Sequence, residues 1–370
     1  MKVALLKMQA KSQGGLEKYA DRIAAAFMKK GADVTLLTTA RSEKRGVDVA
    51  VFPVSKWPGF IKLEQFDRSV ARWLKANPAD IVFGMERNRM QTHIRAGNGV
   101  HAAYLKSRLA SEGRLKYGLC LINPLHRKLL ELEKYAFEHR MLKKIFVNSR
   151  MVRSDILEYY TVDPAKIEVI HNGVEWEEHL SPFSCWQEGK KAALARFGLD
   201  EQDLQLLFIG HGYRRKGLGE LLKALSIWKR KDFHLSVIGK ERNLSQYETL
   251  AMRLGLKGKV RFFGPQKEVV PFYQMADALA IPSFYDPFAN VTLEALSFGL
   301  FVVSSKMNGG HEILSDMNGA VIDTIASPES IAESLARCQK KTAESANRIR
   351  ASIRHFDFSN QLSKLIDACL

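Results

Sequence analysis

Two carboxylates eight residues apart, Asp286 and Glu294, stand where a loop is expected to meet a helix. The apolar run 278–281 before them predicts a buried strand, and the pattern of 291–298 predicts the helix. Asn290 is expected to cap this helix, whose free N–H groups and positive dipole end suit a phosphate. The spacing therefore predicts a clamp for a sugar and a ribose at the two ends of a nucleotide diphosphate. Helix entry alone also favours such acidic residues, so a purely structural role stays open.

A glycine-rich segment, 210–217 (GHGYRRKG), follows the predicted strand 204–209 and opens another helix. Gly210 lets the backbone approach a ligand, and Arg215 and Lys216 add positive charge beside the helix N-terminus. The segment is not a P-loop, because no Gly-Lys-Ser/Thr follows at the required spacing. We predict that it binds a diphosphate, with a simple turn as the alternative.

Two further glycine-rich turns lie in the first half of the chain. Gly14 and Gly15 follow the predicted strand 3–8, and residues 96–101 (AGNGVH) end in His101. A histidine after such a turn is typical of a polar group presented at a cleft, although most single histidines are structural or simply exposed. A tight turn that packs a helix on the sheet is the alternative for the Gly-Gly pair.

These residues are positioned by a regular alternation of strands and helices. Strands are predicted at 3–8, 34–38, 49–52, 81–83, 145–148, 167–170, 204–209, 234–238, 260–263, 278–281 and 301–304, with helices at 16–30, 62–76, 125–143, 218–229, 245–254, 268–275 and 291–298. Such alternation predicts parallel sheets covered by helices on both faces. A polar, irregular stretch at 175–189 is interpreted as the interdomain connection. We therefore expect two α/β domains, 1–174 and 175–370, with the last helix packing back on the first domain.

The composition narrows the class of protein. A chain of 370 residues can form two full cores, and no apolar run approaches the roughly 20 residues that span a bilayer. The N-terminus has the pattern of a first strand rather than a signal peptide. Its four cysteines are too widely spaced for a metal-ligand pattern or a disulfide framework. We therefore predict a cytoplasmic protein.

The positive charge is concentrated in the first half. Residues 1–174 hold 31 Lys and Arg against 17 Asp and Glu, whereas residues 175–370 hold 25 against 23. Such a surface suits a nucleic acid, an anionic lipid surface or a phosphorylated acceptor. No zinc module or aromatic RNP run accompanies it, so nucleic acid is not the expected partner. A generally basic surface is the alternative.

The segment 283–295 resembles the E-x7-E signature of the retaining glycosyltransferases of family 4, with Asp286 where the first Glu normally stands. The run 294–299 (EALSFG) also matches that pattern, and 215–217 resembles the family's pyrophosphate-binding Arg-Lys-Gly motif. The likeness covers nearly the whole chain. Within the family the chain is most similar to the lipopolysaccharide core glucosyltransferase I group, through residues 14–17, 133–138, 148–150 and 210–217.

The resemblance implies a GT-B fold, in which two Rossmann-like, doubly wound domains face a central cleft. It implies a retaining, metal-independent hexosyltransferase without a cofactor, and the absence of an Asp-x-Asp pair agrees. The implied donor is a nucleotide sugar, with UDP-glucose and UDP-N-acetylglucosamine leading. The implied acceptor is a lipopolysaccharide-core or related anionic glycan at the inner-leaflet membrane surface, to which the protein would attach peripherally.

The resemblance also implies roles for individual residues. Glu294 would bind the ribose and Asp286 the transferred sugar, which His101 would also contact. Backbone N–H groups near Asn290 and Val291 would complete the phosphate site. The catalytic set is Asp286, His101, Lys216 and Arg215. The donor-binding set is Gly15, Gly210, Arg215, Lys216, Asp286, Phe288, Asn290, Val291 and Glu294. The acceptor-side set is Gly14, Asn98 and His126, and the sugar hydroxyls are further assigned to Gly309, Gly310 and Glu312.

Two other functions remain open at this stage. A sugar-nucleotide epimerase of the same fold would need no acceptor, and it would isomerise a sugar nucleotide unaided. A non-catalytic nucleic-acid or membrane binder would use the basic first half, and it would bind in a salt-sensitive way without recognising any sugar nucleotide.

Overall fold

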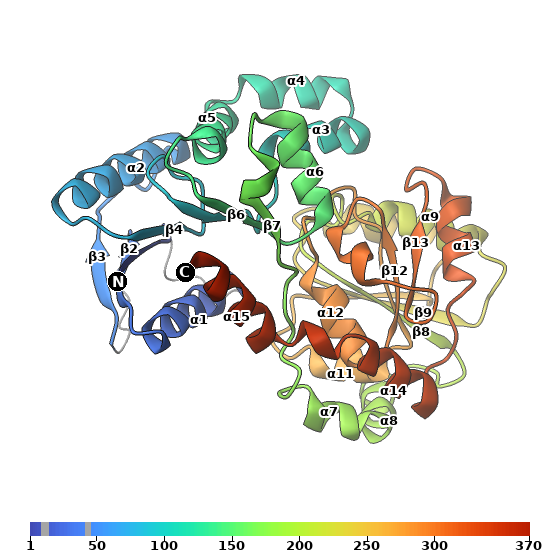
Figure 1. The fold of residues 1–370 in the computed structure, drawn as a ribbon. Helices are drawn as coiled ribbons and strands as arrows, with labels where there is room; N and C mark the ends of the chain where they lie inside the picture. Colours follow the sequence, from blue (N-terminus) through green and yellow to red (C-terminus); the bar gives the residue numbers. More distant parts are fainter. Residues whose placement is uncertain (9–14, 41–45) are drawn as a thin grey trace. The chain divides into compact units, whose positions relative to one another are not determined.

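The computed structural model describes residues 1–8, 15–40 and 46–370, and the chain divides into two compact units. Unit 1 consists of Met1–His171 together with Ser359–Leu370, and unit 2 consists of Asn172–Phe358. The division falls after His171 rather than after Val174. The last residues of the chain belong to unit 1, in which the C-terminal helix lies beside α1 (Figure 1).

Unit 1 is built on a seven-stranded sheet in the order β3-β2-β1-β4-β5-β6-β7, and all paired strands are parallel. Its elements are β1 Lys2–Leu6, α1 Gly15–Lys29, β2 Asp33–Thr38, β3 Asp48–Val51, α2 Gly59–Ala76, β4 Ile81–Gly84, β5 His93–Arg95, α3 His101–Glu112, α4 Arg114–Ile122, α5 Pro124–Glu138, β6 Lys144–Val147, α6 Arg150–Tyr159, the 3-10 turn η1 Pro164–Lys166, β7 Ile167–Val169 and α15 Phe358–Cys369.

Helices cover both faces of this sheet, as the alternation of β1 side chains requires. Val3 and Leu5 pack in one cluster with residues of α1 and α15, whereas Ala4 and Leu6 pack in another with residues of α2. Figure 1 shows α2 above the sheet and α1 and α15 below it. The two apolar layers hold the strand ends, and therefore the loops that follow them, in place.

Unit 2 contains a six-stranded parallel sheet in the order β10-β9-β8-β11-β12-β13. Its elements are α7 Leu180–Ser184, α8 Trp186–Phe197, β8 Leu204–Ile209, α9 Leu218–Ile227, β9 Phe233–Ile238, α10 Leu244–Arg253, β10 Val260–Gly264, α11 Val270–Met275, β11 Ala278–Ile281, α12 Asn290–Ser297, β12 Phe301–Ser305, the 3-10 turn η2 Gly309–Ile313, β13 Gly319–Ile322, α13 Pro328–Leu335, α14 Ala343–Ser352 and the 3-10 turn η3 Arg354–Phe356.

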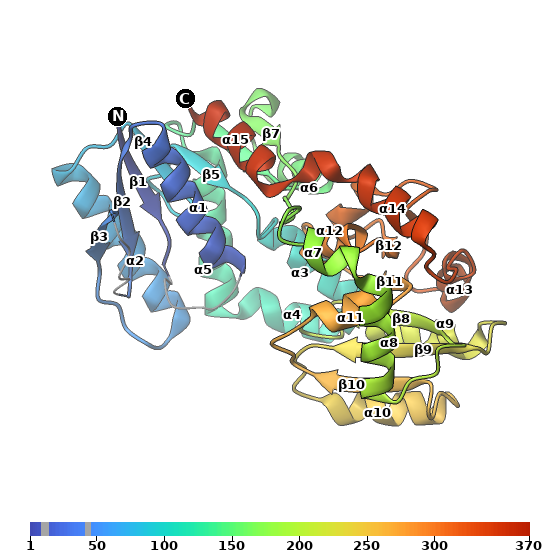
Figure 2. The same cartoon turned by 90° about the horizontal axis from the view of Figure 1, so that it is seen from below.

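The strand order of unit 2 reverses between β8 and β11, which are neighbours in the sheet. In doubly wound sheets, ligands bind beyond the carboxyl ends of the strands at such a reversal. Helices α9 and α13 contribute to one apolar layer, and α8, α11, α12 and α14 contribute to the other. Figure 2 shows α8 and α11 together over the strands. The loops after β8 and β11 are thereby brought together at one edge of the sheet.

Two sequence-based expectations about the elements are wrong, and two helices were missed. The stretch 175–189 is not irregular throughout, because it contains α7 and the start of α8. Pro182 lies in the first turn of α7, where proline is tolerated. The helix expected at 125–143 ends at Glu138. The chain then turns, and the Lys143 N–H donates to the carbonyl of Thr92, just before β5. Helices α3 and α4 were not predicted at all.

No helix in the parts of the chain that the structure describes is both long enough and apolar enough to cross a bilayer. The longest described helix of unit 1, α2, carries charged residues along its length and buries one stripe only.

Candidate functional site

The turn after β8 has a conformation that depends on glycine at its end. Gly217 precedes α9 with φ of 76°, a left-handed value, and a Cβ there would lie 1.9 Å from the carbonyl oxygen of Pro282. Tyr213 is fully buried within the turn and donates its hydroxyl to the Gly239 carbonyl (3.0 Å). The turn is therefore packed directly against the start of the loop that follows β11.

Asp286 lies between the two cations of this turn. Its Oδ2 accepts from Lys216 Nζ at 2.5 Å and from Arg215 Nη1 at 2.8 Å. The Lys216 and Asp286 residues are each 7% exposed, so the three charged groups are largely removed from water. Two cations and one carboxylate leave a net positive charge, which suits the binding of an anion.

The ionisation of Asp286 is controlled by these neighbours. Burial raises the pKa of the carboxyl, but the Lys216 ammonium and the Arg215 guanidinium outweigh it and hold the pKa below its usual value. Asp286 is therefore ionised at neutral pH, and it orients both cations.

The loop that carries Asp286 is tied to the loop after β12. The Asp286 N–H donates to the Met307 carbonyl, and the Gly309 N–H donates to the Asp286 carbonyl, both at 2.9 Å. Asn308, which is fully buried, accepts from the N–H groups of Ala289 (3.0 Å) and Gly310 (3.1 Å). Gly309 and Gly310 were among the predicted site residues, but the role of Asn308 in tying the two loops together was missed.

Glu294 lies in α12, where its Oε2 accepts from the hydroxyl of Tyr273 at 2.6 Å. Burial raises the pKa of Glu294, and the hydrogen bond from Tyr273 opposes this only in part. Asp286 and Glu294 thus have opposite electrostatic environments. Tyr273 was not predicted as a partner of Glu294, because nothing in the sequence connects α11 with this position.

The expected helix cap at Asn290 is wrong. Helix α12 begins at Asn290 itself, Ala289 takes the preceding position, and the N–H of Ala289 is bound by Asn308. The Asn290 side chain instead accepts from Asn172 Nδ2 at 2.6 Å. Phe288, expected to face the donor, is 5% exposed and packs in the core beneath α12, whereas Val291 is half-buried in the first turn.

In unit 1, His101 and His126 are brought together. Nε2 of His101 lies 3.1 Å from Nδ1 of His126, so one ring donates to the other. Burial, reinforced by the positive charge of Arg87, lowers the pKa of His101 to about 3, and burial also lowers the pKa of His126. Both rings are therefore neutral at neutral pH. The link between the two histidines was not predicted.

The start of α3, which carries His101, is held by Glu133 of α5. This fully buried carboxylate accepts from the His101 N–H (2.8 and 2.7 Å) and from the Tyr160 hydroxyl (2.6 Å). It also pairs with Nε of Arg87, whose Nη2 donates to the Gly99 carbonyl at 2.9 Å. Glu133 thus takes the place of a capping side chain, because Val100, at the N-cap position of α3, makes no side-chain cap hydrogen bond.

The remaining predicted residues are less closely tied to these groups. Gly14 lies outside the described residues, and Gly15 is the first residue of α1. Asn98 is exposed in the turn before α3. Gly210 lies against the Lys216 stem, since a Cβ there would be 3.0 Å from Cγ of Lys216. Glu312 is half-buried in η2.

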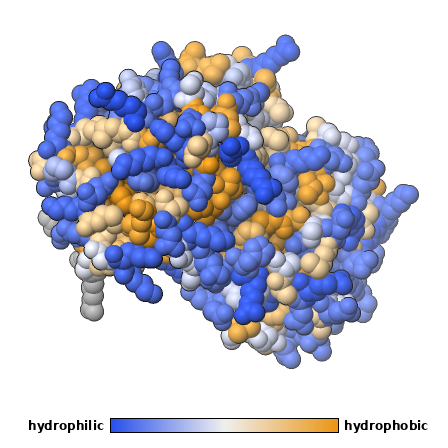
Figure 3. Space-filling model, viewed as in Figure 1, coloured by the Kyte–Doolittle hydropathy of each residue, from blue (hydrophilic) through white to orange (hydrophobic). Residues whose placement is uncertain are grey.

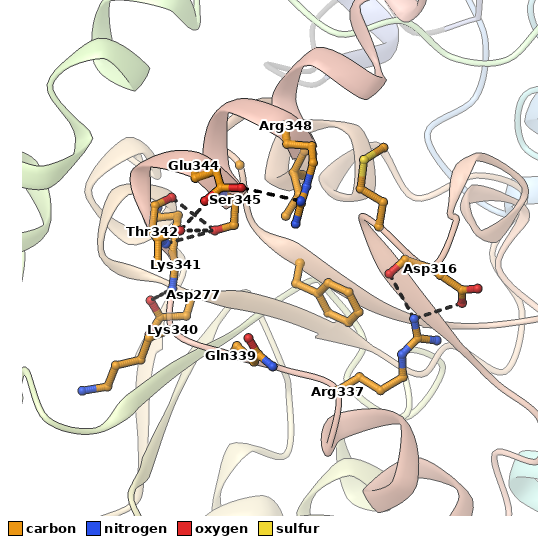
Figure 4. A pocket seen from close by; sticks show the side chains of 14 residues that line it. Asp277, Asp316, Arg337, Gln339, Lys340, Lys341, Thr342, Glu344, Ser345 and Arg348 are labelled. Carbon is orange, nitrogen blue, oxygen red and sulfur yellow. Dashed lines mark hydrogen bonds and ion pairs between the residues drawn. The ribbon is translucent and has the colours of Figure 1, made fainter.

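A cavity of about 330 Å³ in unit 2 lies elsewhere, and Figure 4 shows the side chains that line it. Asp277 and Phe301 contribute to it, and they stand at the amino ends of β11 and β12. Asp277 is bound by Lys190 Nζ (2.5 Å) and by the Lys341 N–H (2.9 Å). The cavity is therefore at the sheet edge opposite Asp286, and its buried charges anchor α8 and the approach to α14.

A cluster of three or more His, Cys, Asp or Glu side chains suited to a metal ion does not occur among residues 1–8, 15–40 and 46–370. Metal independence stays a prediction, to be tested with a chelator.

Family models match both halves of the chain. Residues 190–356 match the model of glycosyl transferases group 1, and residues 13–178 match the model of glycosyltransferase family 4. The group 1 match includes the turn after β8 and the whole segment from Asp286 to Glu312.

Individual proteins show the same relationship. The chain is 24% identical to the lipopolysaccharide glucosyltransferase WaaG of Escherichia coli K12, over 88% of this chain and 86% of WaaG. It is 29% identical to the uncharacterized glycosyltransferase MJ1607 of Methanocaldococcus jannaschii, over 55% of this chain and 53% of that protein.

Solved structures confirm the predicted fold class. The crystal structure of WaaG matches with a TM-score of 0.78 at 23% identity, covering 99% of both chains. A structure of Anabaena HepE in complex with UDP-glucose matches with a TM-score of 0.70 at 17% identity, covering 100% of this chain and 99% of that one. The α/β architecture with two parallel sheets is therefore the GT-B fold. With both family models spanning most of its length, the chain belongs to the glycosyltransferases of family 4.

Proposed function

We propose that the protein moves a hexose from a UDP-sugar to an anionic glycan acceptor of the lipopolysaccharide-core type. The observation that carries this proposal is the convergence of Arg215 and Lys216 on Asp286 at the carboxyl edge of the unit 2 sheet. The similarity to WaaG, named as a lipopolysaccharide glucosyltransferase, supports the acceptor class. The likeness to HepE, whose structure contains UDP-glucose, is consistent with the donor class.

In this proposal the two cations bind the donor diphosphate. An ammonium has three donors and a guanidinium five, so each can keep its bond to Asp286 and still reach a phosphate oxygen. Because Lys216 is nearly buried, its interaction with the developing charge on the leaving diphosphate is only weakly screened. These fixed charges would do the work that a divalent metal performs in other glycosyltransferases.

The other polar groups are assigned to the two ends of the donor. Glu294 binds the ribose, and Asp286 holds the transferred sugar while it orients the cations. The Gly309 and Gly310 backbone, tied to Asp286 through Asn308, lies next to the same sugar. His101 is assigned to the transferred sugar as the family resemblance implies, and its neutral ring can accept or donate a hydrogen bond at neutral pH.

We infer that the reaction proceeds with retention on one face of the sugar. The bond between the anomeric carbon and the diphosphate oxygen breaks, and the leaving oxygen takes the proton of the acceptor hydroxyl. The acceptor oxygen then bonds to the anomeric carbon from the same side. Lys216 and Arg215 favour bond breaking because they stabilise the leaving diphosphate.

A thermal-shift screen of UDP-, GDP- and ADP-sugars tests the donor class. A true donor stabilises the folded state by RT ln(1 + [L]/Kd), so the unfolding temperature should rise as the concentration of a UDP-hexose is raised above its Kd. With the donor known, NMR of the product anomer tests retention. No stabilisation by any sugar nucleotide, or an inverted product, would refute the corresponding part of the proposal.

We further propose that α4 attaches the protein to an anionic membrane surface. Leu115, Leu119 and Ile122 of this helix are 80%, 57% and 69% exposed, and Arg114 and Lys116 are exposed beside them. Figure 3 shows apolar atoms gathered at the top of the view, where Figure 1 labels α4. Exposed apolar side chains among basic ones are typical of a helix that lies in the lipid headgroup region.

Vesicle sedimentation tests this attachment. The protein should bind vesicles that contain phosphatidylglycerol more tightly than neutral phosphatidylcholine vesicles, and high salt should weaken the binding. The double change L115E and L119E should abolish it, while R242E, an exposed charge reversal on unit 2, should not. Equal binding of all three proteins would exclude α4 as the attachment site.

A further inference from the structure

We propose that Tyr273 is a positioning residue that makes the donor site selective for a ribose over a deoxyribose. It would do so by fixing the Glu294 carboxylate in the orientation that receives the ribose hydroxyls. The inference rests on the proposed function, in which Glu294 binds the ribose. It adds a residue on a different helix, α11, to the machinery that recognises the donor.

The contact between the two side chains is short and shielded. Tyr273 is 2% exposed, and its hydroxyl donates to Glu294 Oε2 at 2.6 Å. A buried tyrosine hydroxyl usually finds a partner, but most such partners are backbone carbonyls or neutral groups. Here the partner is the acidic residue of the signature segment, so the hydroxyl acts directly on a group assigned to the ligand.

The ring of Tyr273 is held by the same helix that carries Glu294. It stacks on Phe298 with the ring centroids 5.2 Å apart and the planes 9° from parallel. Phe298 follows Glu294 by four residues, which puts both on one side of α12 and its C-terminal end. The hydroxyl and its acceptor therefore keep their separation even if α12 shifts slightly.

The backbone of Tyr273 is also anchored, from the opposite edge of the sheet. Lys341 Nζ donates to the Tyr273 carbonyl at 3.3 Å and to the Gln274 carbonyl at 3.0 Å. The Lys341 N–H in turn donates to Asp277 at 2.9 Å, in the group that Figure 4 shows. These bonds satisfy carbonyls at the end of α11 and fix the helix that presents the hydroxyl. Lys341 and Asp277, at the amino edge of the sheet, thus support the helix that presents the Tyr273 hydroxyl to Glu294.

The chemistry of a carboxylate explains why such a support matters. An ionised carboxylate has about four acceptor positions, so one bond from Tyr273 leaves capacity for the two ribose hydroxyls. Burial disfavours the charge on Glu294, and the hydroxyl partly restores it. Without the hydroxyl, the carboxylate could rotate or bind a proton, and either change weakens its bonds to a diol.

The inference is tested by measuring the affinity of Tyr273→Phe for UDP-glucose and for its 2′,3′-dideoxyribose analogue. The wild type should prefer the ribose donor, and the variant should lose roughly tenfold in affinity for it, as expected for hydrogen bonds to a charged group. Its affinity for the dideoxy analogue should not change. In a Glu294→Ala background, which removes the acceptor of the Tyr273 hydroxyl, the same substitution should cause no further loss. Tyr247→Phe, a buried tyrosine on α10 of the same unit, is the matched control and should leave both affinities unchanged.

Equal losses for the two donors would overturn the inference and leave the proposed function intact. Failure of the wild type to bind any UDP-, GDP- or ADP-sugar would instead overturn the proposed function, and the inference with it. If Tyr273→Phe does not fold, Phe298→Leu serves in its place, since it removes the stack and keeps the hydroxyl. That variant should also weaken binding of the ribose donor more than binding of the analogue, and an equal effect on both would overturn the inference.

Discussion

The loop after β11 and the helix that follows it each present one carboxylate, and the two are held in opposite ways. Asp286 in the loop is bound by two cations, which lower its pKa. Glu294 in α12 is bound by a neutral hydroxyl, and burial raises its pKa. In the sequence they read as a matched pair, eight residues apart. In the structure they differ in charge environment, and this difference assigns them different tasks.

The difference has an energetic meaning. A carboxylate between two cations is a preformed part of the folded state, because its charge stabilises that state. A half-buried carboxyl group such as Glu294, with only a hydroxyl beside it, carries an ionisation cost until another donor arrives. Asp286 is therefore suited to organise Lys216 and Arg215, and Glu294 is suited to receive hydroxyl groups from a ligand.

The strongest test removes the buried cation. We expect Lys216→Ala to reduce turnover at least about a hundredfold, since the site loses a fixed charge that stabilises the leaving diphosphate. Steady-state kinetics with the identified donor measure this. Lys223→Ala, which removes a half-exposed lysine of α9, is the matched control and should leave turnover unchanged. Turnover of Lys216→Ala within threefold or so of the wild type would contradict the role of the cation pair.

The second test neutralises Asp286. Asp286→Asn leaves Lys216 without its counter-charge in a buried place, so the free energy of unfolding at pH 7 should fall by about 3 kcal/mol. The folded-state pKa of Asp286 is lowered below its unfolded value of about 3.9. Its stabilising effect is therefore complete above that pH and is lost as the pH falls through the folded-state pKa.

Chemical denaturation of both proteins between pH 3 and 7 checks this. The difference between wild type and Asp286→Asn should be largest at neutral pH and should shrink below pH ~4. Asp232→Asn, at an exposed acidic residue that pairs with Arg230, should show little difference at any pH. A pH-independent difference for Asp286→Asn would mean that its charge is not what stabilises the loop.

Local sequence patterns were sufficient to predict which elements carry the two carboxylates and the cation pair. The alternation of apolar runs and turns predicted β8, β11 and α12 with ends that differ by at most one residue. Lys216 and Asp286 were therefore correctly assigned to strand-to-helix connections, and Glu294 to the helix that follows β11. Since parallel strands bring their carboxyl ends to one edge, the meeting of the two loops followed from the topology. Their bonding partners did not follow, because these depend on side-chain directions.

Other features were hidden because they depend on contacts between distant residues. Helix α3 was missed since Val100 offers no cap, and the capping carboxylate is Glu133, 32 residues beyond His101 at the start of the helix. The cap expected at Asn290 failed because Asn308 of another loop binds the preceding N–H. Tyr273 and Glu294 are likewise joined only by tertiary packing. Sequence patterns report local propensity and burial, and they carry no signal for such pairs.

The third test exchanges Glu294 for its neutral counterpart. Glu294→Gln keeps an acceptor for Tyr273 but removes the charge, so KM for the donor should rise about tenfold with a smaller change in kcat. The effect on stability should have the opposite sign to that of Asp286→Asn. Because the folded-state pKa of Glu294 is raised, ionised Glu294 destabilises the fold above its unfolded pKa of about 4.3. The variant should therefore unfold at a higher temperature than the wild type at pH 7, and at the same temperature in acid.

Thermal unfolding of Glu294→Gln at pH 4 and pH 7, measured beside Asp286→Asn, decides whether the two carboxylates differ as described. Stability changes of opposite sign at pH 7 that become small in acid would support different roles for the two carboxylates. A loss of stability in both variants would show that Glu294 is as firmly paired as Asp286, and the division of tasks between them would then be wrong.

The smallest expected effect is that of a chelator. A divalent metal bound to a diphosphate usually takes one or two protein carboxylates as further ligands, and Asp286 is an ionised carboxylate near the proposed phosphate site. If Asp286 instead serves Lys216 and Arg215, those cations supply the positive charge, and excess EDTA should leave the initial rate unchanged. Rates measured with EDTA, and again after adding Mg²⁺ or Mn²⁺, check this. A rate that falls with EDTA and recovers with metal would contradict the assignment of Asp286 to the cation pair. Asp286 would then be a candidate metal ligand, whereas Glu294 would keep its assignment to the ribose.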